Sequence, residues 1–346
     1  MLNKNLFDKT KEEYQDMVES TFFTLAEFND DTNIVLKVDN LEEPSGNTKH
    51  IFRAEEAIQI GSIISKNQGK NVFLINEAFN DNLKNINTSL MDNFYKLYSG
   101  FTKILTRKEE TMNLTLLNMQ CPLTHYENEL AAALYLNSRE TKNDIAMLRN
   151  LRGINIFTPA DSIEARYLLK IVEKNFFKEN KRNFTYFKLS SESSPNIFDK
   201  EYFEKEEGHL KEWTGLPEII YLSKNIEAHF DVAIIASGPI LYNAILAAKE
   251  LEEMNYNVTV LNMSFLSSSS EYLNEKIRSF INNFTDKHTN IVTVEEHSKV
   301  GGLGSLVAEI TSGNKNRANV KVERMGVEDN LSPRAIVAKC EEIVGY

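Results

Sequence analysis

The stretch Val292-Thr-Val-Glu-Glu-His-Ser-Lys-Val-Gly-Gly-Leu-Gly-Ser-Leu-Val-Ala-Glu-Ile310 carries the strongest local signal in the chain. Its apolar start predicts a short buried strand over residues 291–294, and its three glycines predict a tight bend that opens a helix from residue 305. Such a turn either offers backbone N–H groups to a phosphate or lets strand and helix pack closely. Gly-rich turns between strands and helices are common, which favours the packing interpretation.

Outward from this motif, short apolar runs alternate with helical patterns. Strands are predicted over residues 230–238 and 257–263, and helices over 241–254 and 270–284. This βαβαβ series requires right-handed crossovers and a parallel sheet covered on both faces. The run Ser237-Gly238-Pro239 has only one glycine after its strand, so the dinucleotide-binding fingerprint is incomplete.

The first half of the chain has the same alternation and predicts an α/β fold of two doubly wound domains with mostly parallel sheets. Asp161 is the expected N-cap of the helix predicted over 162–175. A polar segment over 191–215 is predicted to link a first domain, 1–190, to a second, 216–346. The predicted elements are helices over 11–29, 54–66 and 162–175 and strands over 33–38, 71–75, 114–119 and 154–157.

Composition excludes several classes of function. With 346 residues, 42% of them hydrophobic, the chain can build two cores. A formal net charge of −11 argues against nucleic acid or an anionic membrane as a partner. Cys121 and Cys340 have no metal-ligand spacing, so no metal site is predicted in this chain. Neither a signal segment nor a run of about 18 apolar residues is present, so we expect a soluble, cytoplasmic protein.

The opening stretch resembles the "EEH…GGLGS" segment of the last domain of transketolases. Two more segments are similar to that family: Asn143-Asp-Ile-Ala-Met-Leu-Arg-Asn-Leu151 with Thr158-Pro-Ala-Asp161 resembles "EDLAMLR…PAD", and Arg324-Met-Gly-Val-Glu-Asp329 resembles the final strand and turn. The resemblance covers nearly the whole chain, strongly from Asp144 onward and weakly before it. It implies the pyrimidine-binding and C-terminal domains of an enzyme that depends on thiamine diphosphate.

The family holds the diphosphate through Mg²⁺ on a "GDG…N" motif in a further domain, because a polyphosphate needs a hard cation with oxygen ligands. No Gly-Asp-Gly occurs in this sequence. The resemblance therefore implies the C-terminal subunit of a split transketolase. Its diphosphate-binding partner would be a separate subunit that holds most of the Mg²⁺ site, in an α2β2 heterotetramer acting on a sugar or sugar-derived substrate.

The resemblance also assigns cofactor-binding residues. Phe52-Arg-Ala-Glu-Glu-Ala-Ile-Gln-Ile-Gly61 is similar to "GIAEQNMVGI", which makes Glu56 the carboxylate that activates the cofactor; Glu55 would misplace Gly61. Phe79, 23 residues beyond Glu56, matches the aromatic ring that stacks on the pyrimidine. The residues alone, without the resemblance, favour a surface acid at a helix start for Glu56 and a core residue for Phe79.

The substrate loop departs from the family. Pro122-Leu-Thr-His125 resembles "DGPTHQ" and makes His125 the catalytic histidine, but 19 residues separate it from Asp144 where the family has about five. Without an insertion, Arg139 would take that position. Ser191 stands where the family's "SRQ" motif has a phosphate-pairing arginine, so the substrate need not be a simple sugar phosphate.

The resemblance implies a transferase that moves a two-carbon ketol unit from a ketose to an aldehyde. The alternatives are the beta subunit of a 2-oxo acid dehydrogenase, a 1-deoxyxylulose-phosphate-synthase-like enzyme, and a non-catalytic paralogue. His297 is expected to be structural or interfacial. His288 and the remaining histidines lie in polar surroundings without ligand spacing.

Overall fold

The structure is a computed structural model of the 346-residue chain. It describes residues 14–28, 32–38, 51–52, 61, 64–65, 67–77, 99, 112–120, 143–151, 153–176, 182–190, 193–204, 210–223, 230–313 and 319–345.

The larger sheet of the described chain has seven strands in the order β12-β6-β7-β5-β4-β2-β3. All neighbours pair in parallel except β12, which runs antiparallel to β6. Its strands are β2 (Asn33–Val38), β3 (Ile51–Phe52), β4 (Asn71–Glu77), β5 (Met112–Gln120), β6 (Ile154–Phe157), β7 (Arg182–Ser190) and β12 (Phe265–Ser267).

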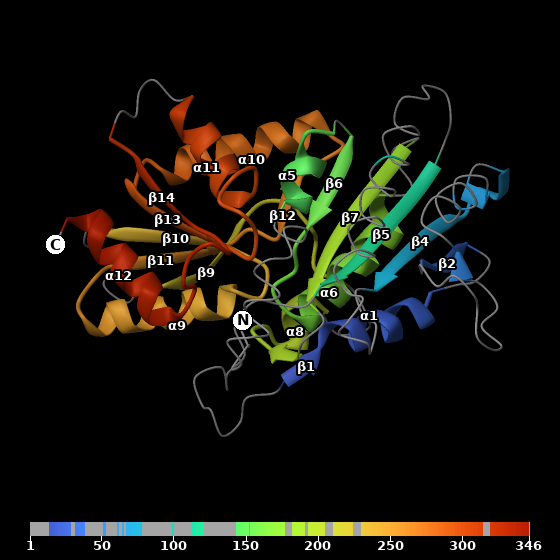
Figure 1. Ribbon diagram of the computed structural model, residues 1–346, viewed down its shortest axis with the longest axis horizontal. Coiled ribbons are helices and arrows are strands. Elements are labelled where there is room, and N and C mark those ends of the chain that lie inside the picture. The colour runs from blue at the N-terminus through green and yellow to red at the C-terminus, as the bar shows by residue number, and fades with distance from the viewer. Residues whose placement is uncertain are drawn as a thin grey trace.

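A second sheet has five described strands in the order β14-β13-β10-β11-β9. They are β9 (Glu218–Leu222), β10 (Val232–Ser237), β11 (Val258–Asn262), β13 (Asn290–Glu295) and β14 (Lys321–Met325). Neighbouring strands pair in parallel except β9, which runs antiparallel to β11. Every residue of β10 and β11 is buried, because helices cover both faces of this mostly parallel sheet. In Figure 1, α9 (Leu241–Glu253) and α12 (Pro333–Val344) lie on one side, and α10 (Glu271–Phe284) and α11 (Leu303–Ser312) on the other.

Shorter elements complete the described fold. Helix α1 (Met17–Ala26) packs against α6 (Ser162–Ile171), which continues as a π-helical turn over Val172–Phe176. A two-stranded antiparallel ribbon joins β1 (Tyr14–Asp16) to β8 (Ser193–Pro195), and α8 (Lys200–Phe203) follows it. Helix α5 (Asp144–Arg149) lies between the two large sheets, beside α11 (Figure 1).

The predicted fold class is confirmed: the chain is a mixed α/β structure with two mostly parallel sheets. Strands β2 and β6 have the predicted bounds, and Asp161 caps α6 as expected, since its side chain accepts a hydrogen bond from Glu164 N. Helix α1 is shorter than the predicted helix over 11–29, because β1 takes up residues 14–16.

The domain limits stay a prediction, but two features bear on them. Within the expected linker over 191–215, residues Ile197, Phe198 and Phe203 are buried in the core. Strand β12, from the expected second domain, pairs with β6 of the first: Phe265 is opposite Phe157. The two expected domains are therefore joined by backbone pairing within the larger sheet.

Candidate functional site

The Gly-rich turn packs tightly around Glu295. The Glu295 carboxylate accepts hydrogen bonds from Leu303 N at 2.6 Å and Gly304 N at 2.8 Å, which are amides at the start of α11. A Cβ added at Gly302 would overlap Glu295 Oε2, so only glycine fits. Burial raises the Glu295 pKa to about 7 despite these two donors. The amides that could have held a phosphate are occupied, which supports the packing interpretation of the motif.

Helix α5 docks on this turn. Gly301 has φ +85° and faces Ala146 so closely that an added Cβ would collide with it. Arg149 donates to Gly301 O at 2.8 Å and Gly302 O at 3.1 Å, and pairs with Glu309 at 2.8 Å. The glycines thus serve the contact between α5 and the second sheet as well as the turn.

His297 is buried at the same contact, which agrees with the expected interfacial role. Its Nε2 accepts a hydrogen bond from Ala146 N at 3.3 Å, so the neutral ring carries its proton on Nδ1, which donates to Ser298 O at 2.8 Å. Burial lowers the His297 pKa to about 4. The imidazole is therefore neutral at neutral pH and is held at both nitrogens.

Asp144 is the charged centre of the contact. It accepts hydrogen bonds from Tyr186 OH at 2.5 Å and from Lys188 Nζ at 3.3 Å, and Asn118 Nδ2 donates to the same tyrosine oxygen at 2.9 Å. Burial would raise the Asp144 pKa, but Lys188, His297 and the tyrosine hydrogen bond lower it below the usual value. We call Asn118, Asp144, Tyr186, Lys188 and His297 the interdomain polar cluster.

A second buried acid pair, at the start of α6, ties that helix to the second sheet. Asp161 accepts from Glu164 N at 2.8 Å and from Ile197 N at 2.7 Å. Glu164 accepts from Ala160 N at 2.7 Å and from Asn262 Nδ2 on β11 at 2.8 Å. Burial, followed by the neighbouring Asp161 charge, raises the Glu164 pKa to about 8, and burial raises that of Asp161 to about 6. The hydrogen bonds of Asp161 hold the backbone at Ile197, and those of Glu164 hold the contact between α6 and β11.

The residues predicted from the resemblance lie outside the described part of the chain. This applies to Glu56, Phe79 and His125, and to the alternatives Glu55, Arg139 and Ser191. Their roles stay predictions. The structure does describe the strands that precede Glu56, Phe79 and Ser191.

Those strands are in register at one edge of the larger sheet. Phe52 of β3 pairs with Val38, which pairs with Asn76 of β4, and Asn76 pairs with Asn118 of β5, which pairs with Lys188 of β7. The interdomain polar cluster thus lies near the carboxyl ends of β5 and β7. In open α/β sheets this edge is where ligands bind.

Three further observations concern the described residues only. They contain no group of three or more His, Cys, Asp or Glu side chains placed to hold a metal ion. No helix among them is long and apolar enough to cross a membrane. The expectation for His288 was wrong: it is buried, stacks on Phe230 and Phe284, and contacts Thr259 Oγ1 at 2.9 Å.

With this geometry in view, residues 224–345 match the family model "Transketolase, C-terminal domain". This segment is similar to the C-terminal domain of transketolases. It contains α9 to α12 and the β10, β11, β13 and β14 strands of the second sheet. The resemblance found in the Glu295–Gly304 turn is therefore confirmed, and the turn has a place in the transketolase domain as the surface on which α5 docks.

Similarity to transketolases extends beyond that domain. The chain is 29% identical over 187 residues to one subunit of the apulose-4-phosphate transketolase of Phocaeicola vulgatus, across 54% of this chain and 50% of that protein. It is 33% identical over 106 residues to the 1-deoxy-D-xylulose-5-phosphate synthase of Desulfitobacterium hafniense, across 31% of this chain and 16% of the synthase. The matches span half or less of these relatives' own lengths.

A solved structure has the same fold over nearly the whole chain. It is titled "Split gene transketolase, inactive beta4 tetramer", and it aligns with a TM-score of 0.67 and 20% identity over 95% of this chain and 98% of that one. The chain is thus similar in fold and in extent to the beta subunit of a split transketolase.

Sequence reasoning missed the interdomain polar cluster. It placed Asp144 in a family motif but gave no role to Tyr186 or Lys188. The available signal was the presence of Asn118 and Lys188 next to apolar residues of β5 and β7, because polar side chains are buried only with partners.

Proposed function

We propose that this chain is the C-terminal subunit of a thiamine diphosphate-dependent transketolase-like enzyme. The complete enzyme transfers a two-carbon ketol unit from a ketose to an aldehyde. A separate subunit supplies the diphosphate site and most of the Mg²⁺ ligands, and two copies of each form a heterotetramer. The absence of Gly-Asp-Gly from the sequence and the likeness to split-transketolase subunits support this division.

The observation that carries the proposal is the topology of the larger sheet. From β2 the chain goes to β3 on one side of it and then crosses to β4 on the other, so β2 and β4 flank a switch point. Ligands bind outside the carboxyl ends of strands at such points. Glu56 comes four residues after the end of β3, and Phe79 two residues after the end of β4. Phe79 follows β4, which borders the switch point, and Glu56 follows β3, which pairs with the other bordering strand, β2.

The proposed roles follow from chemistry at this edge. The Glu56 carboxyl group exchanges a proton with a pyrimidine nitrogen, which sets the protonation state of the cofactor. Phe79 packs its ring on the pyrimidine face. His125, or Arg139 from the same stretch, holds or moves the proton of a substrate hydroxyl or carbonyl group. Thiamine diphosphate, when bound, supplies the carbon nucleophile.

The interdomain polar cluster would support this site without taking part in the reaction. Neutral His297 and ionised Asp144 fix α5 against the C-terminal domain, next to the carboxyl ends of β5 and β7. We expect this contact to keep the sheet edge in position when the diphosphate-binding subunit closes over it.

A second candidate function has its own support. The 1-deoxy-D-xylulose-5-phosphate synthases are relatives, so the chain could serve an enzyme that forms this kind of product. The sequence also left open a 2-oxo acid dehydrogenase beta subunit and a non-catalytic paralogue. These four functions differ in the acceptor they use, or in having none.

Reconstitution tests the proposal. The full chain is purified with the diphosphate-binding subunit of the same organism, and three assays are run: ketol transfer, 1-deoxyxylulose 5-phosphate formation and acyl transfer to lipoamide. We expect ketol transfer only from the mixture, and tight thiamine diphosphate binding by calorimetry only from the mixture. Tight binding by this chain alone would refute the split site, and a mixture inactive in all three assays would favour the non-catalytic paralogue.

The donor can be examined in the same assay. The P. vulgatus relative is named for a phosphorylated ketose, apulose 4-phosphate, whereas Ser191 replaces the arginine expected to pair with a sugar phosphate. We expect Ser191→Arg to improve the use of fructose 6-phosphate relative to unphosphorylated ketoses. Equal use of both substrates by the unaltered enzyme would contradict the inference from Ser191.

A further inference from the structure

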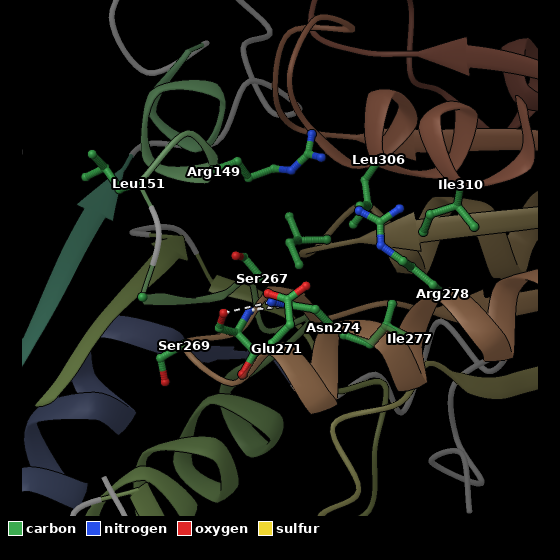
Figure 2. A pocket seen from close by; sticks show the side chains of 13 residues that line it. Arg149, Leu151, Ser267, Ser269, Glu271, Asn274, Ile277, Arg278, Leu306 and Ile310 are labelled. Carbon is green, nitrogen blue, oxygen red and sulfur yellow. Dashed lines mark hydrogen bonds between the residues drawn. The ribbon is translucent and has the colours of Figure 1, made fainter. Parts of the chain in front are cut away.

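A cavity of about 670 Å³ lies between α5, α10 and α11, away from the carboxyl edge of the larger sheet (Figure 2). Both parts of the chain line it: Arg149, Leu151 and Gly153 come from the first, and the remaining residues from the transketolase C-terminal domain. Its volume falls within the range of about 300–1,000 Å³ that is usual for small-molecule sites.

The charges at this cavity differ from those of the whole chain. The chain has a formal net charge of −11, but the described residues that line the cavity include two arginines and one acid, Glu271. Arg149 is already held by Gly301 O, Gly302 O and Glu309, so its guanidinium is fixed in place. A fixed guanidinium loses little conformational entropy when it binds an anion.

Arg278 is the more available of the two cations. Its ion pair in the described structure is a 3.7 Å contact with Glu275 on the same helix, and both side chains are about half exposed or more. Exposed pairs of this kind contribute little. Figure 2 shows the guanidinium groups of Arg278 and Arg149 on the Leu306 side of the cavity. Guanidinium groups bind phosphate through paired hydrogen bonds.

The other end of the cavity is suited to hydroxyl groups. Ser267, Ser269, Glu271 and Asn274 line it, and Figure 2 shows them grouped apart from the two guanidinium groups. The Ser269 hydroxyl oxygen is buried beneath the cavity surface, so Ser267, Glu271 and Asn274 present the polar groups at this end. Carboxylate, amide and hydroxyl groups together can accept and donate the hydrogen bonds of a polyol.

We propose that this interdomain cavity binds a small phosphorylated polyol, with Arg278 and Arg149 on the phosphate and Ser267, Glu271 and Asn274 on the hydroxyl groups. The site is separate from the proposed catalytic edge. A ligand there would touch α5 and α10 together. Because α5 also carries Asp144 of the interdomain polar cluster, binding would stabilise the contact between the two sheets.

Ribitol 5-phosphate is the test ligand, since it has no carbonyl group for ketol transfer. Its binding to the full chain is measured by calorimetry and by hydrogen exchange of residues 266–278, with ribitol and inorganic phosphate for comparison. Arg278→Gln should weaken binding roughly tenfold or more, because it removes a charged hydrogen-bond donor. Lys276→Gln removes the same charge from a neighbouring position of α10 outside the cavity lining, and should change the affinity by less than about twofold.

Glu271→Gln provides a second arm. It should weaken binding of ribitol 5-phosphate but not of inorganic phosphate, because its proposed partners are the hydroxyl groups. The proposal is overturned if the unaltered chain shows no saturable binding at millimolar ribitol 5-phosphate, or if Arg278→Gln and Lys276→Gln behave alike. Equal affinity for inorganic phosphate would overturn the assignment of a polyol. These outcomes do not depend on catalytic activity, so they stand apart from the test of the proposed function.

Discussion

His297 and Asp144 meet across the contact between the two large sheets, with Nε2 of the histidine 3.7 Å from Oδ1 of the carboxylate and both side chains 1% exposed. Their pKa values are both lowered, that of His297 to about 4, so the pair is a neutral ring beside an ionised acid at neutral pH. The charge of Asp144 is balanced by Lys188 at 3.3 Å. The ring contributes packing and two hydrogen bonds, and the carboxylate contributes the electrostatic link to β7.

Asp144→Asn should destabilise the protein strongly. The change removes the carboxylate beside the Lys188 ammonium, which is only 12% exposed, and weakens the short hydrogen bond from Tyr186. Breaking a buried ion pair from one side typically costs about 3–5 kcal/mol of unfolding free energy. Urea denaturation measures it. Glu309→Gln is the control, because Glu309 is 54% exposed in its pair with Arg149 and should cost less than about 1 kcal/mol. Equal losses in the two variants would contradict the role assigned to Asp144.

Glu164 should make stability fall as pH rises through neutrality. Its pKa is raised from 4.5 to about 8 in the folded protein, so between these values the folded state binds more protons than the unfolded state. Stability then decreases with rising pH, by at most about 1.4 kcal/mol per pH unit for one group. The contribution of His297 to the pH dependence of stability has the opposite sign, because folding lowers its pKa from 6.5 to about 4. This contribution is confined to the pH range between those two values.

Glu164→Gln should therefore flatten the pH dependence between pH 7 and pH 8, the window above the folded pKa of Glu295. The measurement is the urea midpoint of both proteins at several pH values in this window. The slope against pH is compared, since the substitution also changes absolute stability. A variant with the slope of the unaltered protein would show that Glu164 does not titrate there.

Gly302→Ala should disrupt the turn before α11. The new methyl group would overlap Glu295 Oε2, and the carboxylate cannot withdraw without losing its bonds to Leu303 N and Gly304 N. Overpacking of this kind costs about 1–3 kcal/mol. Gly313→Ala, at the other end of α11, is the matched control. Its φ is −72°, and its nearest contact for a new Cβ is 3.6 Å. A fall in melting temperature for Gly313→Ala as large as for Gly302→Ala would refute the steric argument.

Local patterns in the sequence predicted much of the fold. Strands β2 and β6 and helix α10 could be located because their apolar periodicity is clear, and Asp161 because a cap is a local signal. Strand β7 was missed because its sequence, Arg-Asn-Phe-Thr-Tyr-Phe-Lys-Leu-Ser, contains polar residues throughout and has no continuous apolar run. Its Lys188 pairs with Asp144, which lies 44 positions away at the start of α5 and gives no local signal. Strand β12 was missed because it has three residues and a partner 108 positions earlier in the chain, Phe157 for Phe265.

The candidate site was predictable only in part, because contacts between residues far apart in the sequence leave no local pattern. Resemblance could assign Glu56, Phe79 and His125 by position in a motif, whereas the interdomain polar cluster depends on contacts between residues far apart in sequence. His297 and Asp144 are 153 positions apart, and no periodicity relates them. The glycines of the opening motif predicted either a ligand site or a tight turn. The structure favours the turn, because the Glu295 carboxylate accepts the hydrogen bonds of the first amides of α11.

Glu56→Gln tests the cofactor-activating carboxylate in the reconstituted complex. Glutamine keeps the size of the side chain but cannot exchange a proton with the pyrimidine nitrogen, and loss of general acid–base help typically lowers a rate about 10²- to 10⁴-fold. We expect kcat for ketol transfer to fall by that factor, while thiamine diphosphate binding measured by calorimetry weakens far less. Glu55→Gln is the matched control, since it makes the same change one residue earlier. If Glu56→Gln retains near-normal kcat, or loses no more than Glu55→Gln, then Glu56 is not the activating group and the non-catalytic alternative gains support.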